Sequence, residues 1–373
     1  MRSSLLQPIV FKRALLAATV LPAMASLVVP LGLIPETTSS GQWFVFFIMF
    51  VSLAHVPSTL YLFSDRELIE NPGFTRRQMI YIPLVLVALA LSALFYLTPK
   101  NNDQTSILLF YVWIGFFMWQ HWHFGRQNLG VLAFCLMGPN GRKISSFERL
   151  TINLASLCGV LVIYGMAGEA LRKKYVDDAA FISHDIALAW AADIGLVLQV
   201  SVSIASVLYV TLNRRSFTPL TMTIYLCSAS FFLPIYFQDQ FILPQFAAAH
   251  AFQYMVFLAY HSMSRMDHQN TGATNTGAGK TNISAPCLLI LAFLLGGLYY
   301  VQEHEIAVFL SEIGNVTGVF EITQNRALLL VIGLDMGVTL AHFWYDSLFW
   351  KLRIPSQRKW AEKRFSFMFK NNN

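Results

Sequence analysis

Residues 186–212 read IALAWAADIGLVLQVSVSIASVLYVTL and contain one charged side chain, that of Asp193. About 20 consecutive apolar residues are enough for a helix to span the hydrocarbon core of a bilayer. This stretch therefore predicts a membrane-spanning helix. Comparable apolar runs, separated by short polar segments, occur along the whole chain. Together they predict ten spans, at 14–34, 43–63, 79–97, 106–137, 148–171, 186–212, 219–237, 244–263, 286–301 and 327–350.

The composition indicates a membrane protein. Of the 373 residues, 55% are hydrophobic and 12% are charged, whereas roughly 25% charged residues are usual in soluble domains. This deficit argues against a water-soluble enzyme and indicates an all-α, polytopic transmembrane helix bundle, with residues 1–350 as one domain. The net charge of +6 does not indicate nucleic acid binding, because no soluble domain presents a basic patch. The four cysteines lie in apolar runs without a CxxC pair, which argues against disulfides or a thiolate zinc site.

The distribution of Lys and Arg predicts the orientation in the membrane. Most of these residues fall in segments that share one side with the N-terminus, and cytoplasmic loops are enriched in them. We expect both termini to be cytoplasmic and the chain to be a multi-pass protein of a bacterial inner membrane. Residues 351–373 are predicted to be a basic, aromatic cytoplasmic tail, for which an interfacial lipid anchor and a disordered end are both open.

Several spans carry ionisable side chains, which are costly inside a bilayer and so indicate function. They are His55 in the second span, His121 and His123 in the fourth, His250 and His261 in the eighth, and His342, Asp335 and Asp346 in the tenth. All four spans run in the same direction. Counting residues back from their cytoplasmic ends places His55, His250 and His342 within ~8 Å of one another in depth, at ~1.5 Å per residue. We therefore expect histidines from different helices to converge.

The spacing within each span indicates which side chains share a face, since positions i, i+4, i+7 and i+11 lie on one side of a helix. In the tenth span this series comprises Asp335, Thr339, His342 and Asp346. In the eighth span it comprises His250, Tyr254, Phe257 and His261. In the fourth span His123 and Gln127 are i,i+4 neighbours, whereas His121 lies about 200° from His123 and is expected to point elsewhere.

These residue types favour an intramembrane metal site. Neutral imidazole is a common ligand for zinc, iron and copper, and a nearby carboxylate completes or orients the set. The predicted ligands are His55, His123, His250, His342 and Asp346, with His121 as a weaker candidate. Whether His261 or Asp335 joins them is open. A mixed set with open positions favours one or two iron ions over zinc, which suits hydrolysis.

Three further polar residues are candidate catalytic groups. Gln127 and Gln253 are expected to orient ligands or substrate, and Tyr254 to donate a proton or a hydrogen bond. The predicted activity is that of a membrane-embedded oxidoreductase or oxygenase. Its partners would be the bilayer, O2, an unidentified electron donor and a lipophilic substrate that enters from the bilayer.

Four segments carry a resemblance to multi-span membrane proteins with scattered intramembrane histidines: HVPSTLYLFSD, HWHFGRQNLG, HAFQYMVFLAYH and AHFWYDSLFWKLR. Within them, residues 122–125 (WHFG) are similar to a step found in Brp/Blh-type β-carotene dioxygenases. The HxxHH box of fatty acid desaturases and hydroxylases is absent from the sequence. The resemblance implies a class of activity, that of a non-haem iron oxygenase embedded in the bilayer.

Two other functions fit the same residues. A proton- or cation-coupled transporter would use the buried His and Asp side chains as a relay. However, the sequence has no evident internal repeat, and the polar groups cluster toward the cytoplasmic half. Two facing intramembrane histidines would also suffice to hold a haem.

Overall fold

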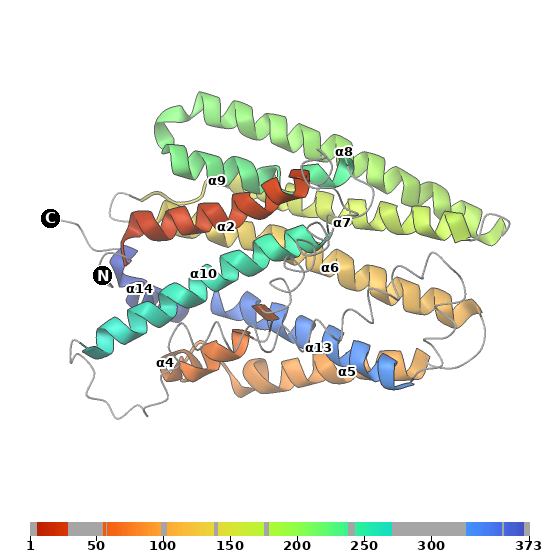
Figure 1. Ribbon diagram of the computed structural model, residues 1–373, viewed down its shortest axis with the longest axis horizontal. Helices are drawn as coiled ribbons and strands as arrows, with labels where there is room; N and C mark the ends of the chain where they lie inside the picture. Colours follow the sequence, from red (N-terminus) through yellow and green to blue (C-terminus); the bar gives the residue numbers. More distant parts are fainter. Residues whose placement is uncertain are drawn as a thin grey trace.

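The computed structural model describes residues 6–28, 55–97, 103–137, 141–174, 179–237, 243–270 and 326–368, apart from Pro57 and Arg353. This described part is helical and contains no strand. Its long helices lie side by side in a bundle (Figure 1). The predicted all-α fold is therefore confirmed for these residues.

Seven long helices form the described bundle. They are α2 (Pro8–Val28), α5 (Ile82–Leu97), α6 (Asp103–Leu136), α7 (Ser146–Lys174), α8 (Ala179–Leu212), α10 (Leu243–Asn270) and α13 (Arg326–Phe349). The shorter elements are η1 (Thr59–Ser64), α4 (Arg66–Ile69), the π-helical η2 (Arg77–Tyr81), η3 (Arg214–Ser216), α9 (Pro219–Ala229), η4 (Leu233–Phe237), α14 (Pro355–Arg364) and η5 (Ser366–Met368). Helix α7 packs along α6 and α8, α13 along α5, and α10 along α2.

Glycines allow some of these helices to approach closely. A Cβ atom at Gly337 of α13 would lie 2.7 Å from Cα of Val87 in α5. A Cβ atom at Gly125 of α6 would overlap Ser156 of α7. Small residues at such crossings are typical of membrane helix pairs, because they bring the backbones together. Gly125 therefore sets the distance between α6 and α7 close to His123.

Four helical segments of the described part are long and apolar enough to cross a membrane. They are Arg77–Leu94, Ser146–Gly165, Trp190–Leu212 and Pro219–Tyr236. They overlap four of the ten predicted spans. Helices α6, α10 and α13 coincide in position with three further predicted spans but are not among these four segments. The predicted span 286–301 lies outside the described residues.

The outer surfaces of α5 and α8 are apolar. Leu84 and Leu89 of α5 are 60% and 61% exposed, and Val197 of α8 is 69% exposed. Apolar patches of this kind are rare on soluble monomers. A lipid environment solvates such side chains, so these faces suit contact with the bilayer.

The described helices show whether two of the predicted spans are continuous. The span 219–237 is interrupted, because α9 ends at Ala229 and η4 begins at Leu233. Pro234 has no amide hydrogen, and its ring would clash with the carbonyl of residue 230 in an α-helix. Conversely, α6 runs from Asp103 to Leu136 without a break at Gly125 or Gly130. The long fourth span is thus one helix that extends beyond the ~30 Å hydrocarbon core.

The predicted tail is folded onto the bundle as far as it is described. Trp360 of α14, Phe365 and Phe367 are buried. The rings of Phe365 and Phe367 each lie 5.7 Å from the ring of Phe11 in α2. Residues 354–368 therefore share the core of the bundle, and these aromatic side chains do not point into lipid. The first turns of α2 and α14 lie at the same end of the bundle (Figure 1).

Candidate metal centre

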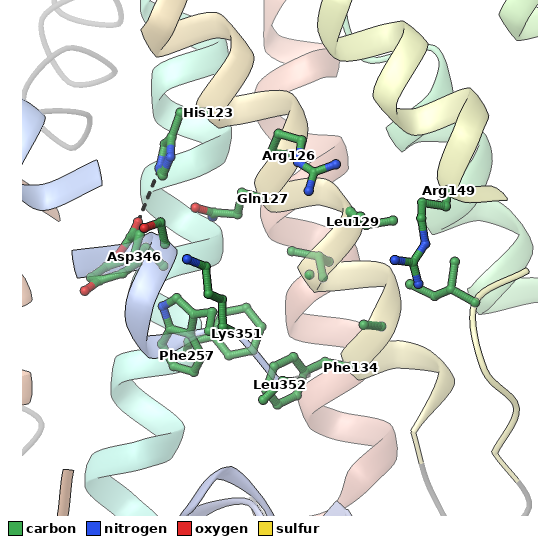
Figure 2. Close-up of a pocket in the computed structure, with 17 residues that line it drawn as sticks. His123, Arg126, Gln127, Leu129, Phe134, Arg149, Phe257, Asp346, Lys351 and Leu352 are labelled. Atoms are coloured by element: carbon green, nitrogen blue, oxygen red, sulfur yellow. Dashed lines mark ion pairs between the residues drawn. The ribbon is translucent and has the colours of Figure 1, made fainter. Parts of the chain in front are cut away.

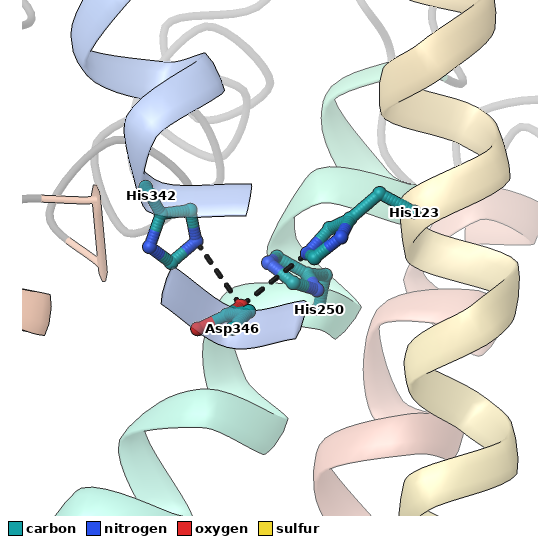
Figure 3. A group of neighbouring side chains, drawn as sticks. All are labelled: His123, His250, His342 and Asp346. Carbon is teal, nitrogen blue, oxygen red and sulfur yellow. Dashed lines mark ion pairs between the residues drawn. The ribbon is translucent and has the colours of Figure 1, made fainter. Parts of the chain in front are cut away.

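Three histidines and one aspartate meet between α6, α10 and α13 (Figure 3). They are His123 from α6, His250 from α10, and His342 and Asp346 from α13. One potential ligand atom of each residue lies within 4.8 Å of those of the other three. The i,i+4 spacing of His342 and Asp346 explains their common face. Four of the six predicted metal ligands are thus brought into one group.

The distances in this group suit a metal ion. Nε2 of His123 lies 3.3 Å from Oδ2 of Asp346, and Nε2 of His342 lies 3.4 Å from the same oxygen. Two ligands that bind one ion at about 2.0–2.1 Å are themselves about 3.3 Å apart in tetrahedral geometry. An ion therefore fits between these atoms with little movement of the side chains.

The environment of His250 also fits a bound cation. Its side chain is buried, with 1% of the residue exposed. Within the described part of the chain, neither of its ring nitrogens has a hydrogen-bond partner. Buried polar atoms without partners are rare in native proteins, and each one calls for an explanation such as an ion. Coordination of a metal by one nitrogen of His250 would supply such a partner.

A hydroxyl group orients the His342 ring. Oγ1 of Thr59 lies 2.5 Å from Nδ1 of His342, and the Tyr254 hydroxyl donates a hydrogen bond of 2.9 Å to Oγ1 of Thr59. If Nε2 of His342 held a metal, Nδ1 would carry the ring proton and donate a hydrogen bond to Oγ1 of Thr59. This arrangement leaves Nε2 of His342 directed at Asp346. The sequence did not identify Thr59, although its position one turn after His55 was an available signal.

His55 lies beside the four-residue group without belonging to it. Its ring centroid is 4.6 Å from that of His250 and 4.8 Å from that of His342. It is buried and helical, four residues before η1. The structure therefore places this predicted ligand in contact with two members of the group, but its ring nitrogens do not complete the cluster.

His121 is directed away from the centre. Its Nδ1 lies 2.8 Å from the carbonyl oxygen of Phe117, and its ring packs against Phe124 and Phe232. Because His121 and His123 are two residues apart on α6, their side chains leave the helix in nearly opposite directions. This predicted ligand therefore lies outside the group. His121 is buried among aromatic side chains, and this setting disfavours a positive charge on its ring.

The two predicted catalytic glutamines form a network with each other. Nε2 of Gln127 donates to Oε1 of Gln253 and to the backbone carbonyl of His250, both at 3.0 Å. Nε2 of Gln253 donates to Oγ1 of Thr19 and Oδ1 of Asn128, both at 2.9 Å. These bonds join α2, α6 and α10. Gln127 therefore supports the backbone at His250, Gln253 holds Gln127 in place, and neither glutamine contacts a ligand side chain in these bonds.

His261 takes part in a separate cluster around Asp65. The carboxylate of Asp65 accepts hydrogen bonds from Nε2 of His261 at 2.8 Å, from Trp360 at 3.1 Å, and from Arg364 at 2.8 and 2.9 Å. Burial acts to raise the pKa of Asp65, but hydrogen bonding and charge from His261 and Arg364 outweigh it and lower this pKa well below its usual range. The cluster ties α14 to α4 and α10. Asp335, also left open by the sequence, is buried on α13 about three turns from Asp346 and outside the ligand group.

A cavity of about 420 Å³ adjoins the ligand group (Figure 2). His123, Asp346 and Tyr254 are among the residues that line it. The side chain of His123 is 13% exposed, against 5% for Asp346 and 1% for His342. Small-molecule sites are usually cavities of roughly 300–1,000 Å³. The centre is therefore reachable from this cavity, on the side of His123.

The described chain thus holds a group of three histidines and one carboxylate, two members of which line a cavity. Comparison of the chain with protein-family models, with curated proteins and with solved structures gives no match.

Proposed function

We propose that this protein is a membrane-embedded, metal-dependent oxidoreductase that acts on a lipophilic substrate. The observation that carries the proposal is the convergence of His123, His250, His342 and Asp346 beside a cavity. The buried nitrogens of His250 add support, because a metal ion is the partner that such a cluster otherwise lacks.

Iron is the proposed metal, with O2 as co-substrate. Sets of histidine and carboxylate ligands with open positions are typical of non-haem iron oxygenases, and four ligands suit one ion. Bound there, iron would supply the redox chemistry of oxygen activation. The rings of His55, His123, His250 and His342 contact one another at centroid distances of 4.6 to 6.1 Å. Such direct ring contacts favour a bare ion over a haem, which would have to lie between two rings.

The residues of the chain have distinct roles in this proposal. His123 is the ligand nearest the cavity, so substrate meets the centre on its side. Tyr254 lines the cavity and its hydroxyl donates to Thr59, so it is the proposed proton or hydrogen-bond donor toward a substrate. Phe134, Phe257 and Trp350 form part of the apolar wall and would limit the access of water to the reacting groups.

The proposed setting is a bilayer crossed ten times, with both ends of the chain at the cytoplasmic face of a bacterial inner membrane. The distribution of Lys and Arg supports this orientation. The resemblance of residues 122–125 to Brp/Blh-type β-carotene dioxygenases supports the class of reaction, and His123 is part of that similarity.

Elemental analysis and an absorption spectrum of the detergent-purified protein test the proposal. We expect about one equivalent of iron and no Soret band in the wild-type protein. His250→Ala and Asp346→Asn should lose the iron, because each removes a ligand. His121→Gln is the matched control, since it changes a buried histidine on α6 outside the ligand group and should retain iron.

Two results would overturn the proposal. A wild-type protein without metal, with variants that fold normally, would assign the buried histidines to proton-coupled transport. A Soret band that disappears in His250→Ala would assign them to a haem. If iron is present, oxygen uptake with lipophilic substrates should be detectable and should be absent in His123→Ala.

A further inference from the structure

The cavity beside the ligand group has two chemically different kinds of lining. One kind is apolar, and its members include Leu129, Val131, Phe134, Phe257, Trp350 and Leu352. The other kind is cationic and consists of Arg126, Arg149 and Lys351. The only carboxylate among the 17 residues that line the cavity is Asp346, which is paired with His123 and His342. The cavity therefore carries an excess of positive charge.

Arg149 and Lys351 have no acidic partner among the described residues. Within the described residues, no carboxylate oxygen lies within 4 Å of Arg149 or Lys351. Glu148 precedes Arg149 in the chain, but its carboxylate is taken up by Arg142 and by the amide of Ser145. These two cations are therefore available to an anion in the cavity.

Arg126 has a different role. Its guanidinium group donates to Oδ1 of Asn153 and lies over the ring of Trp122 at 5.9 Å. These contacts hold the Arg126 side chain in place, and from there it contributes positive potential to the cavity. Arg149 and Lys351 are the side chains that can move onto a ligand, since Arg149 is exposed and Lys351 is half-buried.

Arg149 is separated from the reactive residues across the cavity. In Figure 2, His123 and Asp346 lie at one side with Lys351 below them, Arg149 lies at the opposite side, and Phe257, Phe134 and Leu352 lie below and between them. A ligand that reaches both sides needs an anionic group at one end and a hydrocarbon portion that extends along the apolar wall. If the ligand carried no anion, the charges of Arg149 and Lys351 would face its apolar part. Covering unpaired charges in this way is costly.

We propose that the cavity binds a single-chain amphiphile with an anionic head group, either a carboxylate or a phosphate. The head group pairs with Arg149 through charge-assisted hydrogen bonds, the hydrocarbon chain passes toward His123 and Asp346, and Lys351 adds positive charge to the cavity. This inference rests on the proposed function, because it names the substrate class for the same centre. The expected occupant is therefore an acidic lipid and not an uncharged terpenoid hydrocarbon.

Quenching of tryptophan fluorescence by a dibrominated fatty acid tests this inference in detergent-purified protein. Trp350 lines the cavity and is the reporter, so Trp350→Phe should remove most of the quenching. We expect the free acid to bind at least about tenfold more tightly than its methyl ester at pH 8, since only the acid carries a charge. Equal affinities for acid and ester would overturn the proposal.

Charge-removing variants locate the head group. Arg149→Gln combined with Lys351→Gln should lower the affinity for the acid to that for the ester and leave the ester affinity unchanged. The matched control combines Arg214→Gln with Lys359→Gln, which removes two exposed cations outside the cavity and should behave as wild type. Loss of acid and ester binding to the same degree would contradict the proposed pairing.

Competition distinguishes a lipid from a free anion. A lysophosphatidic acid should displace the dibrominated acid, whereas inorganic phosphate alone should not. Displacement by inorganic phosphate at concentrations similar to those of lysophosphatidic acid would show that the cavity binds simple anions. That result would overturn the proposal of an amphiphile.

Metal content separates this inference from the proposed function. The Arg149→Gln, Lys351→Gln protein should retain wild-type iron, and His250→Ala should still prefer the acid over the ester. A protein without iron that keeps this preference would overturn the proposed function alone. A protein with iron that lacks the preference would overturn the inference alone.

Discussion

Oγ1 of Thr59 lies 2.5 Å from Nδ1 of His342 and connects this imidazole to the hydroxyl of Tyr254. Groups that hydrogen-bond the second nitrogen of a histidine ligand fix its orientation, and their removal typically lowers metal affinity about 10–100-fold. We expect Thr59→Val to reduce iron affinity by that amount. A titration against a competing chelator measures the change. Thr59→Ser keeps the hydroxyl and should stay close to wild type, and equal affinities in all three proteins would show that Thr59 only fills space.

Gln253 should contribute to stability more than to chemistry. Gln253→Leu removes the acceptor of Gln127 and the donor to Thr19 and Asn128, all of which are buried or half-buried. Leaving such groups without partners costs about 1–3 kcal/mol. We expect a lower thermal midpoint and unchanged iron content per folded protein. In a double-mutant cycle with Thr19→Val, the two losses of stability should be less than additive, because both substitutions remove the same hydrogen bond. Iron loss at full stability would instead place Gln253 in the metal centre.

Asp65 should make the stability of the protein depend on acid pH. Its folded-state pKa is depressed by His261 and Arg364, so the carboxylate stabilises the fold above the unfolded-state pKa of about 3.9. This contribution should fall as the pH drops below about 4 toward the folded-state pKa. The stability difference between wild type and Asp65→Asn, measured by denaturation in detergent, should therefore be constant above this range and narrow below it. In a His261→Gln background the narrowing should be smaller, because one of the two groups that lower the pKa of Asp65 is removed. A difference that does not narrow below pH 4 would show that the pKa of Asp65 is not depressed.

Gly125 should be more sensitive to substitution than Gly115 on the same helix. A Cβ atom at Gly125 overlaps both the side chain and the backbone of Ser156, whereas a Cβ atom at Gly115 meets nothing within 4 Å. Overpacking of this kind typically costs about 1–3 kcal/mol. We expect Gly125→Ala to lower the thermal midpoint and Gly115→Ala to leave it unchanged or raise it. If the two variants behave alike, α6 and α7 do not pack at this point as described.

Some features of the centre could be predicted from the sequence because they depend on local periodicity. The i,i+4 spacing places His342 and Asp346 on one face of α13, and the two-residue spacing separates His121 from His123. The relative heights of His55 and His123 depend on helix tilt and on packing between helices. Counting residues could not resolve them, and His55 lies beside the ligand group instead of within it.

Contacts between distant parts of the chain were the least accessible to sequence reasoning. Gln127 and Gln253 were predicted to act near the ligands, but their bonds extend to Thr19 in the first described helix. The basic and aromatic tail suggested a lipid interface by composition alone. Its Arg364 instead pairs with Asp65, which is 299 positions earlier in the chain. Neither partner has a local pattern that indicates the other.

The location of the four candidate ligands on three helices has a consequence for biogenesis. If these helices span the membrane as proposed, His123 and His250 enter it on α6 and α10 while α13 is still being synthesised, since translation proceeds from residue 123 toward residue 346. Until α13 is inserted, these two imidazoles have neither His342 nor Asp346 beside them. Capture of the proposed metal would therefore follow insertion of α13, and the nascent protein would pass through a stage in which its most polar helices must be retained in the bilayer without an ion.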